Sequence, residues 1–222
     1  MAAVARPLLV RGRSFTAKHA LWIVFGLMTL FVLVTREWTL LDSRSFLRQR
    51  YAPVPLLMVA HGLPGALALF LGAFQFSSRL RQRYRQAHRV MGRIYVGSVL
   101  ISAPLAVAVA VALPMPTLFM ATLLQSLGWL VATGVALYCV RVGRIQQHRE
   151  WMMRGYPFAM VFVVARVLIA IPAIDRMGVM GLVMVVWSAV AAAGVVPSFL
   201  LAIQSLMASQ RTSPLRATQA AD

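Results

Sequence analysis

Six long apolar stretches constrain the fold of this chain more than any other feature. Each comes close to the roughly 20 residues that an α-helix needs to cross the hydrocarbon core of a bilayer. Because a bilayer offers no water to the backbone, such stretches form helices. A water-soluble fold is a poor alternative, since 60% of the 222 residues are hydrophobic. The sequence predicts an all-α integral membrane bundle of six transmembrane helices, at residues 19–36, 53–76, 91–113, 117–139, 156–173 and 179–203.

The basic residues between these stretches predict the orientation of the bundle. Lys and Arg number 16 in the segments on one side and five in those on the other, with Arg166 counted on neither side. Because positively charged loops stay in the cytoplasm, both termini are predicted to be cytoplasmic. The formal net charge of +17 comes from residues that flank apolar runs. We therefore expect contacts with membrane lipids and their anionic headgroups, and no nucleic acid.

The predicted organisation adds a short extension at each end of a central bundle. Four basic residues precede the first stretch, as in a signal peptide, but no small-x-small cleavage motif follows, so it is predicted to be a retained span. Cys139 is the only cysteine, which excludes an internal disulfide and predicts a packing residue.

The sequence divides into five predicted parts. They are a basic cytoplasmic N-terminus (1–18), a first helix with its outer loop (19–52), a four-helix core (53–173), a sixth helix (174–205) and a disordered tail (206–222).

Two basic segments on the cytoplasmic side share a motif. They read His88-Arg89-x-x-Gly92-Arg93-x-Tyr95 and His148-Arg149-x-Trp151-Met152-x-Arg154-x-Tyr156. On a helix, spacings of four and three residues place His88, Gly92 and Tyr95 on one face. Gln75 ends the second stretch at the same level. These segments predict an inner-rim polar cluster of Gln75, His88, Arg89, Arg93, Tyr95, His148, Arg149, Trp151, Arg154 and Tyr156.

The two imidazoles of this cluster leave three interpretations open. One is a b-type haem ligated by His88 and His148, with nearby Arg side chains paired to the propionates. These two histidines are predicted as metal ligands only if haem is present. A second interpretation is another specific ligand. The third is that both histidines cap helix entrances and touch headgroups, which their position near the membrane surface favours.

Arg166 predicts a second polar site, in the outer half of the bundle. A buried Arg costs at least ~2.5 kcal/mol even on the lenient insertion scale, and no acidic residue lies inside the six stretches. At ~1.5 Å per residue, Arg166 lies roughly 10 Å from the outer end, near the height of His61 and Gln125. These three residues predict an intramembrane pocket for a small anionic or lipid-like ligand. The alternative is a polar cluster that only locks helices together.

These motifs together resemble a known family. His61, the segment Gly72-x-Phe74-Gln75-Phe76, the two basic motifs and Arg166 are similar to bacterial predicted membrane proteins of domain-of-unknown-function family 2306 (DUF2306). The resemblance covers about residues 55–170. It implies a multi-pass protein of the bacterial cytoplasmic (inner) membrane with no established activity. The first and sixth spans would then be additions that flank the family core.

Several signatures of catalysis are absent from the sequence. The chain has no Walker loop, no His-Glu-x-x-His motif and no carboxylate pair within the apolar stretches. ATP-driven work and hydrolysis by two acids are therefore not expected, and the question of enzymatic activity stays open. The leading hypothesis is a membrane protein that binds a small anionic or lipid-like ligand. The alternatives are a haem-dependent redox protein and a non-catalytic scaffold or interaction subunit.

Overall fold

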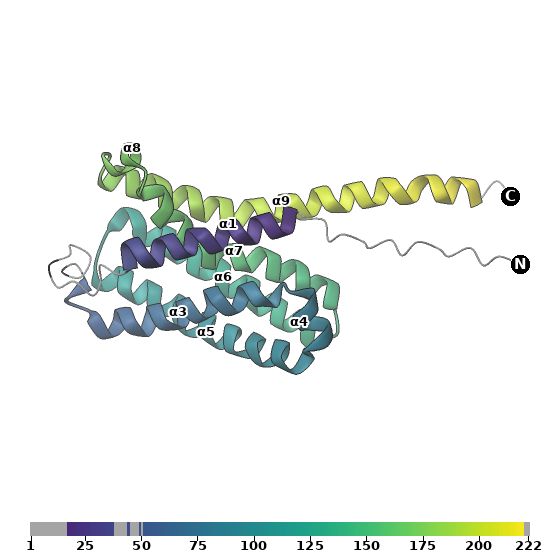
Figure 1. Ribbon diagram of the computed structural model, residues 1–222, viewed down its shortest axis with the longest axis horizontal. Helices are drawn as coiled ribbons and strands as arrows, with labels where there is room; N and C mark the ends of the chain where they lie inside the picture. The colour runs from purple at the N-terminus through teal and green to yellow at the C-terminus, as the bar shows by residue number, and fades with distance from the viewer. Residues whose placement is uncertain (1–16, 38–43, 45–48, 50, 220–222) are drawn as a thin grey trace, which may run out of the picture.

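The computed structural model describes residues 17–37, 44, 49 and 51–219, with the backbone alone at 17–19, 21, 36, 37 and 208–219. Within this part the chain is all-α (Figure 1). Five helices are long and apolar enough to cross a membrane, which confirms an all-α, multi-span architecture. The elements are α1 (Ala17–Val32), the π-helical segment η1 (Leu33–Glu37), α3 (Pro55–Gln75), α4 (Ser78–Arg83), α5 (Arg85–Ala112), α6 (Pro116–Arg141), α7 (Ile145–Ile169), α8 (Pro172–Asp175) and α9 (Val179–Gln219).

The first predicted span is the exception among the apolar helices. α1 and η1 together cover the predicted residues 19–36, and the stretch of them that is continuously described with side chains is apolar from Trp22 to Thr35. This length is shorter than the ~17–25 residues of most transmembrane helices. The structure therefore has five long apolar helices and a shorter N-terminal one, and the sixth span remains a prediction.

Prolines determine several helix ends. Pro55 and Pro116 stand at the first positions of α3 and α6, where a missing N–H costs nothing. The α conformation is sterically unfavourable for the residue that precedes a proline. Ile171, which precedes Pro172, is accordingly extended, with φ −71° and ψ 123°. α7 therefore ends at Ile169, before the predicted end of the fifth span at 173.

Three other boundaries differ from the prediction. α5 begins at Arg85 rather than 91 and α7 at Ile145 rather than 156, so both basic motifs lie within helices. Arg and Gln are good helix formers, and they extend a transmembrane helix beyond its apolar part. The backbone of α9 also continues past the predicted end of the sixth span at 203, to Gln219. The disordered tail from 206 stays a prediction. Most of the predicted N-terminal part, 1–18, lies outside the described residues.

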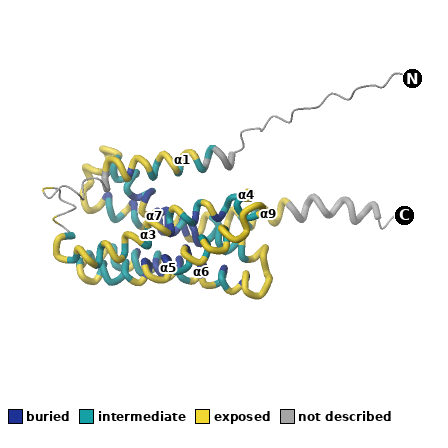
Figure 2. Tube along the Cα trace, turned by 60° about the horizontal axis from the view of Figure 1, so that its bottom comes forward, coloured by how far each residue is buried: buried dark blue, intermediate teal, exposed yellow. Residues whose placement is uncertain are grey.

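The helices pack around α7, and long helices that follow one another along the chain are antiparallel (Figure 1). α3 pairs with α5, α6 pairs with α7, and α5 lies beside α6, while α9 and α1 cover α7 (Figure 1). Buried residues gather where α3, α5, α6 and α7 face each other, and α1 is largely exposed (Figure 2). We call the end with α4 the inner end and the end with α8 the outer end. α3 and α6 finish at the inner end, and α5 and α7 begin there.

Glycines allow the closest contacts between these helices. A Cβ at Gly72 of α3 would lie 2.6 Å from Cε2 of Tyr156 and 3.0 Å from Cε2 of Tyr95. A Cβ at Gly128 of α6 would lie 2.6 Å from Cζ of Phe158. Small residues at such interfaces let helices associate in lipid, where no hydrophobic effect drives them together.

Candidate functional site

Two tyrosines form the centre of the inner half of the bundle. Tyr95 of α5 is 1% exposed, and its hydroxyl accepts a hydrogen bond from Nε1 of Trp129 on α6 at 3.1 Å. The hydroxyl of Tyr156 on α7 donates to the Leu69 carbonyl on α3 at 3.0 Å. Both rings lie against Gly72. This group of contacts ties α3, α5, α6 and α7 to each other at one height.

Buried polar atoms without partners lie beside these tyrosines. Gln75 is 8% exposed, and its side chain packs on α5, where a Cβ at Gly92 would lie 3.4 Å from Oε1. Its Nε2 has no hydrogen-bond partner within the described part of the chain. Thr133 of α6 is 3% exposed and lies close to the Tyr95 hydroxyl, yet its Oγ1 also lacks a partner there. A buried polar group without a partner is costly, so these atoms need an explanation.

The two inner histidines are neighbours. Arg81, Arg89 and His148 lie near His88, so two guanidinium charges act on its imidazole. The Nδ1 atom of His88 is buried and has no partner among the residues described. Nδ1 of His148 lies 2.8 Å from the Ala136 carbonyl oxygen. Because a carbonyl only accepts, this nitrogen carries the hydrogen, and Nε2 of His148 is left as an acceptor.

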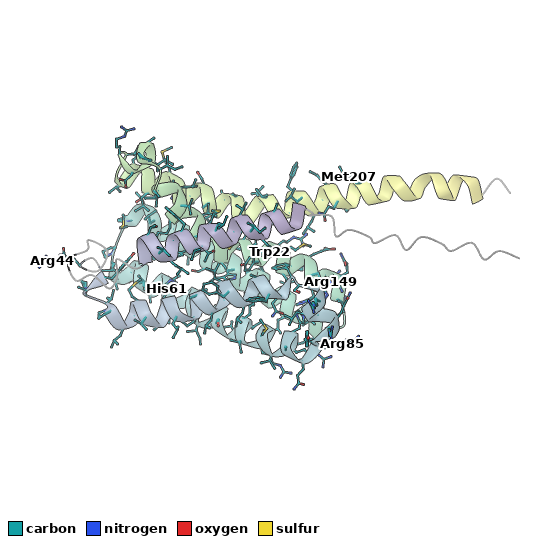
Figure 3. All side chains as sticks on the ribbon, in the orientation of Figure 1. Trp22, Arg44, His61, Arg85, Arg149 and Met207 are labelled. Carbon is teal, nitrogen blue, oxygen red and sulfur yellow. The ribbon has the colours of Figure 1, made fainter. Side chains whose placement is uncertain are left out.

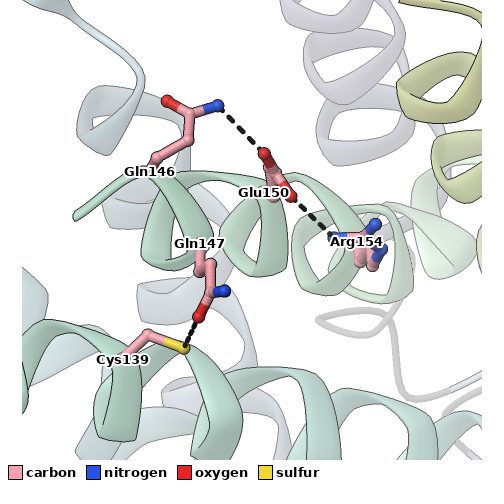
Figure 4. Close-up of polar contacts among 5 residues, drawn as sticks. All are labelled: Cys139, Gln146, Gln147, Glu150 and Arg154. Atoms are coloured by element: carbon pink, nitrogen blue, oxygen red, sulfur yellow. Dashed lines mark hydrogen bonds and ion pairs between the residues drawn. The ribbon is translucent and has the colours of Figure 1, made fainter. Parts of the chain in front are cut away.

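The remaining members of the predicted inner-rim cluster are more exposed than this centre. Arg89, Arg93 and Arg149 are exposed, and Figure 3 shows Arg149 with other side chains at the inner end. The guanidinium of Arg154 lies 5.1 Å from the ring centroid of Trp151 and 3.8 Å from Glu150 (Figure 4). The structure thus brings part of the predicted cluster together and places the rest on the surface.

His61 of the predicted outer site belongs to a contact between α3 and α5. Its Nδ1 lies 2.9 Å from the Ser102 carbonyl oxygen, and the Ser102 hydroxyl donates to the His61 carbonyl at 3.0 Å. Gly65, one turn further along α3, allows this approach, since a Cβ there would lie 3.0 Å from Ser102 Oγ. The partners of His61 are therefore on the neighbouring helix.

Gln125 and Arg166 have other surroundings. Nε2 of Gln125 donates to the Phe158 carbonyl on α7 at 3.0 Å. Arg166 lies two turns further along α7, in the last turn of that helix, with its guanidinium 5.1 Å from the centroid of the Phe162 ring. Since Phe162 is 44% exposed, this contact is at the edge of the bundle. Arg166 is in the last turn of α7 because Pro172 ends the helix early, and its predicted depth of roughly 10 Å in the membrane stays a prediction.

An apolar cavity lies between α1, α3 and α7. Its volume is about 250 Å³, and it is lined by Trp22 and Gly26 of α1, Phe70 of α3, and Tyr156 and Met160 of α7. The Trp22 ring lies 6.1 Å from the Tyr156 ring, centroid to centroid, and closes one side of it. Phe70 is 43% exposed, so the cavity lies at the surface that faces lipid. The ring of Tyr156 separates it from Tyr95.

Clusters of metal-ligating side chains were also sought in the described part of the chain. The described residues contain no group of three or more His, Cys, Asp or Glu that could hold a metal ion. The thiol of Cys139 at the end of α6 is buried and donates to Oε1 of Gln147 at 3.8 Å (Figure 4). This contact links α6 to the start of α7 and fits the packing role predicted for the cysteine.

Comparison with protein families agrees with this architecture. A family model described as "Predicted membrane protein (DUF2306)" matches residues 58–206. The chain belongs to this family. No curated protein and no solved structure matches it. The family description and the five long apolar helices together define a multi-pass DUF2306 membrane protein, which confirms the predicted family. The match begins in α3 and ends in α9, so it includes the sixth predicted span, which the resemblance had left outside the family core.

Sequence reasoning missed two side chains of this DUF2306 protein. Trp129 and Thr133 of α6 complete the surroundings of Tyr95, but both lie within a long apolar run. Together with Gln125 they form a row at steps of four residues. Residues at this spacing share one face of a helix, so the row is a signal that indicates the polar face of α6.

Proposed function

We propose that this protein binds a lipid-like ligand within the bilayer, with an apolar chain of the ligand in the α1–α3–α7 cavity. We further propose that it lies in a bacterial cytoplasmic membrane with six spans and both termini in the cytoplasm. The observation that carries the proposal is the cavity between α1 and the family core.

The chemistry of the cavity favours an apolar group. Its lining is mainly aromatic and aliphatic, and its two hydroxyls are used internally. Thr29 donates to the Phe25 carbonyl at 2.8 Å, and Tyr156 donates to the Leu69 carbonyl at 3.0 Å. The Trp22 indole N–H is the remaining polar side-chain atom of the lining, so a polar group placed here would have few partners, which is unfavourable in an apolar environment. The cavity therefore suits a hydrocarbon or isoprenoid chain.

The size of the cavity favours a chain that extends into the membrane. Its volume of about 250 Å³ is below the ~300–1,000 Å³ of sites that enclose a whole small molecule. Such a space holds only part of a ligand, and the exposed position of Phe70 leaves a lateral opening. The rest of the ligand would lie in the bilayer.

Photo-crosslinking tests this proposal. The full-length protein in nanodiscs is incubated with a diazirine-bearing fatty acid, irradiated and analysed by peptide mass spectrometry. We expect label on α1, α3 and α7 peptides that line the cavity. A Cβ at Gly26 would meet no other atom within 4 Å, so Gly26→Phe fills the cavity without a backbone clash. This variant should lose the label.

Gly134→Phe is the matched control. A Cβ at Gly134 of α6 also meets nothing within 4 Å, but this glycine is exposed and lies outside the cavity. It should be labelled like the wild type. Even labelling over all lipid-facing peptides, or equal loss in both variants, would show that only annular lipid is bound and would refute the proposal.

The outer pocket of His61, Gln125 and Arg166 stays a prediction. We do not place the ligand there, because His61 and Gln125 each have a hydrogen bond to a neighbouring helix. These bonds fit the alternative role of joining helices.

One observation favours a second function, a membrane redox protein with b-type haem. His148 donates from Nδ1 to a backbone carbonyl, as metal-binding histidines often do, and Nε2 remains able to ligate. His88 is its neighbour, with Arg81 and Arg89 available for propionates. A bound haem would supply one-electron chemistry.

An optical spectrum of the purified protein tests the haem. A Soret band that is lost in both His88→Ala and His148→Ala supports this function. Protein that stays colourless when haem is supplied during expression rejects it.

The arginines of the inner end support a further proposal about partners. A surface hollow of about 580 Å³ surrounds the first turn of α5 and is lined by Arg83, Tyr84 and Arg85, among others. Arg85 lies at the inner end of the bundle (Figure 3). Each basic residue near an anionic bilayer surface contributes about 1 kcal/mol of attraction. We propose that anionic headgroups bind here, which flotation with vesicles of increasing phosphatidylserine content tests.

A further inference from the structure

Three buried polar atoms at the inner end of the bundle lack hydrogen-bond partners within the part of the chain that is described. They are Nε2 of Gln75, Nδ1 of His88 and Oγ1 of Thr133. Gln75 and Thr133 are 8% and 3% exposed, so neither is satisfied by the aqueous phase. Each such atom costs about 1–3 kcal/mol when it is left unpaired.

The three atoms come from three helices but lie along one face of α5. His88, Gly92 and Tyr95 share this face, since they are spaced by four and three residues. Gln75 of α3 packs at Gly92, and Thr133 of α6 lies close to the Tyr95 hydroxyl. At ~1.5 Å per residue, the face from His88 to Tyr95 is ~10 Å long. The unpartnered atoms therefore belong to one continuous polar strip.

Gly92 leaves room in the middle of this strip. A Cβ placed there would meet only Oε1 and Cδ of Gln75 within 4 Å. A larger residue at this position would fill the surface of α5 between His88 and Tyr95. The strip is therefore bordered by polar side chains, and the Gln75 side chain packs beside the glycine at its centre.

All three groups can donate. The Gln75 amide nitrogen only donates, while the Thr133 hydroxyl and a His88 ring nitrogen can each present a hydrogen. The Tyr95 hydroxyl accepts from Trp129, and its own hydrogen points to the nearest acceptor, the Thr133 oxygen, so that the Thr133 hydrogen is left to donate. Arg81 and Arg89 add positive charge around His88. A set of donors in a positive field suits a ligand that only accepts hydrogen bonds.

We propose that this strip is a binding site for an oxyanion, a carboxylate or phosphate group, held by the side chains of Gln75, His88 and Thr133. Its His88 end lies in the first turn of α5, at the inner end of the bundle. It is distinct from the apolar α1–α3–α7 cavity, whose hydroxyls are already paired. The oxyanion comes either from a free solute or from a lipid headgroup.

Thermal unfolding of the full-length protein tests this site. Inorganic phosphate and acetate are compared with chloride at constant ionic strength, in nanodiscs of phosphatidylcholine. A second set of nanodiscs contains phosphatidic acid. A ligand that binds the native state raises Tm. A rise with phosphate or acetate indicates a free anion, and a rise with phosphatidic acid alone indicates a headgroup.

Gln75→Leu is the decisive variant, and Gln125→Leu is its matched control. Gln75→Leu removes an unpaired donor, so Tm without ligand should stay equal or rise, while anion binding weakens about 10- to 100-fold. Gln125→Leu breaks a hydrogen bond to the Phe158 carbonyl, so Tm without ligand should fall while the anion response is kept. If Gln75 had only a structural role, Gln75→Leu would instead lower the Tm measured without ligand.

Thr133→Val is the second variant, in case Gln75→Leu yields no folded protein, and it should also weaken the anion response. The proposal is overturned if no anion raises the Tm of the wild type above that in chloride. It is also overturned if both variants keep the full response. A Soret band that disappears in His88→Ala would assign His88 to haem and would likewise refute the anion site.

Discussion

The outer and inner halves of the bundle use similar polar residues in different ways. In the outer half, His61 bonds to Ser102 and Gln125 bonds to the Phe158 carbonyl, so both join neighbouring helices. In the inner half, Nε2 of Gln75 and Oγ1 of Thr133 have no partner among the described residues. Two glutamines at opposite ends of the same core thus differ in whether the fold satisfies them. In our proposal the outer polar groups stabilise the bundle, whereas these two inner groups serve a ligand.

Loose packing does not explain the unpaired inner groups. Tyr95 is almost completely buried there, and Gly72 is in close contact with both Tyr95 and Tyr156. Protein interiors of this kind are packed as densely as organic crystals. The unpaired donors are therefore held in place by a rigid surrounding, which is what a binding site requires. Substitutions in the two halves test this contrast.

The largest effect is expected for Tyr95→Ala in the inner half. Loss of this ring leaves a cavity and an unpaired Trp129 N–H, and should reduce the free energy of unfolding by about 3–5 kcal/mol. Equilibrium unfolding of the protein in mixed micelles measures it. Tyr84→Ala is the control, because Tyr84 is 50% exposed and should change stability little. Similar losses in both variants would show that the inner half is not the packed centre.

Gly72→Ala should have the next largest effect. The added methyl group would lie 2.6 Å from the Tyr156 ring, so the ring must move, at a cost of about 1–3 kcal/mol. Gly62→Ala on the same helix meets no atom within 4 Å and should be neutral or stabilising by up to about 1 kcal/mol. The same unfolding measurement compares the two. A neutral Gly72→Ala would mean that α3 and α7 are further apart than the structure shows.

The sequence predicts the helices of this protein well and their ends less well. Bilayer thickness sets the length of an apolar run, so α3, α5, α6, α7 and α9 were found from hydropathy. Their ends depend on other forces. Basic residues that favour helix extend α5 to Arg85 and α7 to Ile145, and Pro172 shortens α7 at its other end.

The site could be predicted only in part. The repeated basic motif and the end of α3 led to Gln75, Tyr95 and Tyr156, which the structure brings together. Their partners Trp129 and Thr133 were not predicted, because α6 is apolar on nearly every side. For such a helix the hydropathy pattern does not show which face meets its neighbours. The rotation of α6 against α5 comes from close packing, which a single sequence does not display.

Ser102→Ala tests the outer half. It removes the hydroxyl that donates to the His61 carbonyl, and hydrogen bonds between transmembrane helices contribute about 0.6 kcal/mol on average and at most about 1.7 kcal/mol. The free energy of unfolding should fall by this amount. Ser205→Ala is the control, since the Ser205 hydroxyl is exposed and bonds only within its own helix. If Ser102→Ala is as stable as this control, the outer polar groups do not join helices.

The smallest effects, and the sharpest contrast in sign, are expected for two threonines of α6. Thr133→Val replaces an unpaired buried hydroxyl by a methyl group of similar size and should leave stability equal or raise it by about 0.5 kcal/mol. Thr122→Val removes a hydroxyl that donates to the Leu118 carbonyl at 3.0 Å and should lower stability by about 0.5 kcal/mol. Both variants make the same chemical change on the same helix, so helix propensity and lipid effects cancel in their difference. Stability is measured in chloride, where the proposed inner site holds no oxyanion. If Thr133→Val then lowers the free energy of unfolding more than Thr122→Val does, the Thr133 hydroxyl has a structural partner. The contrast between hydrogen-bonded polar groups in the outer half and unpaired ones in the inner half would then not hold for Thr133, the most buried of the unpaired residues.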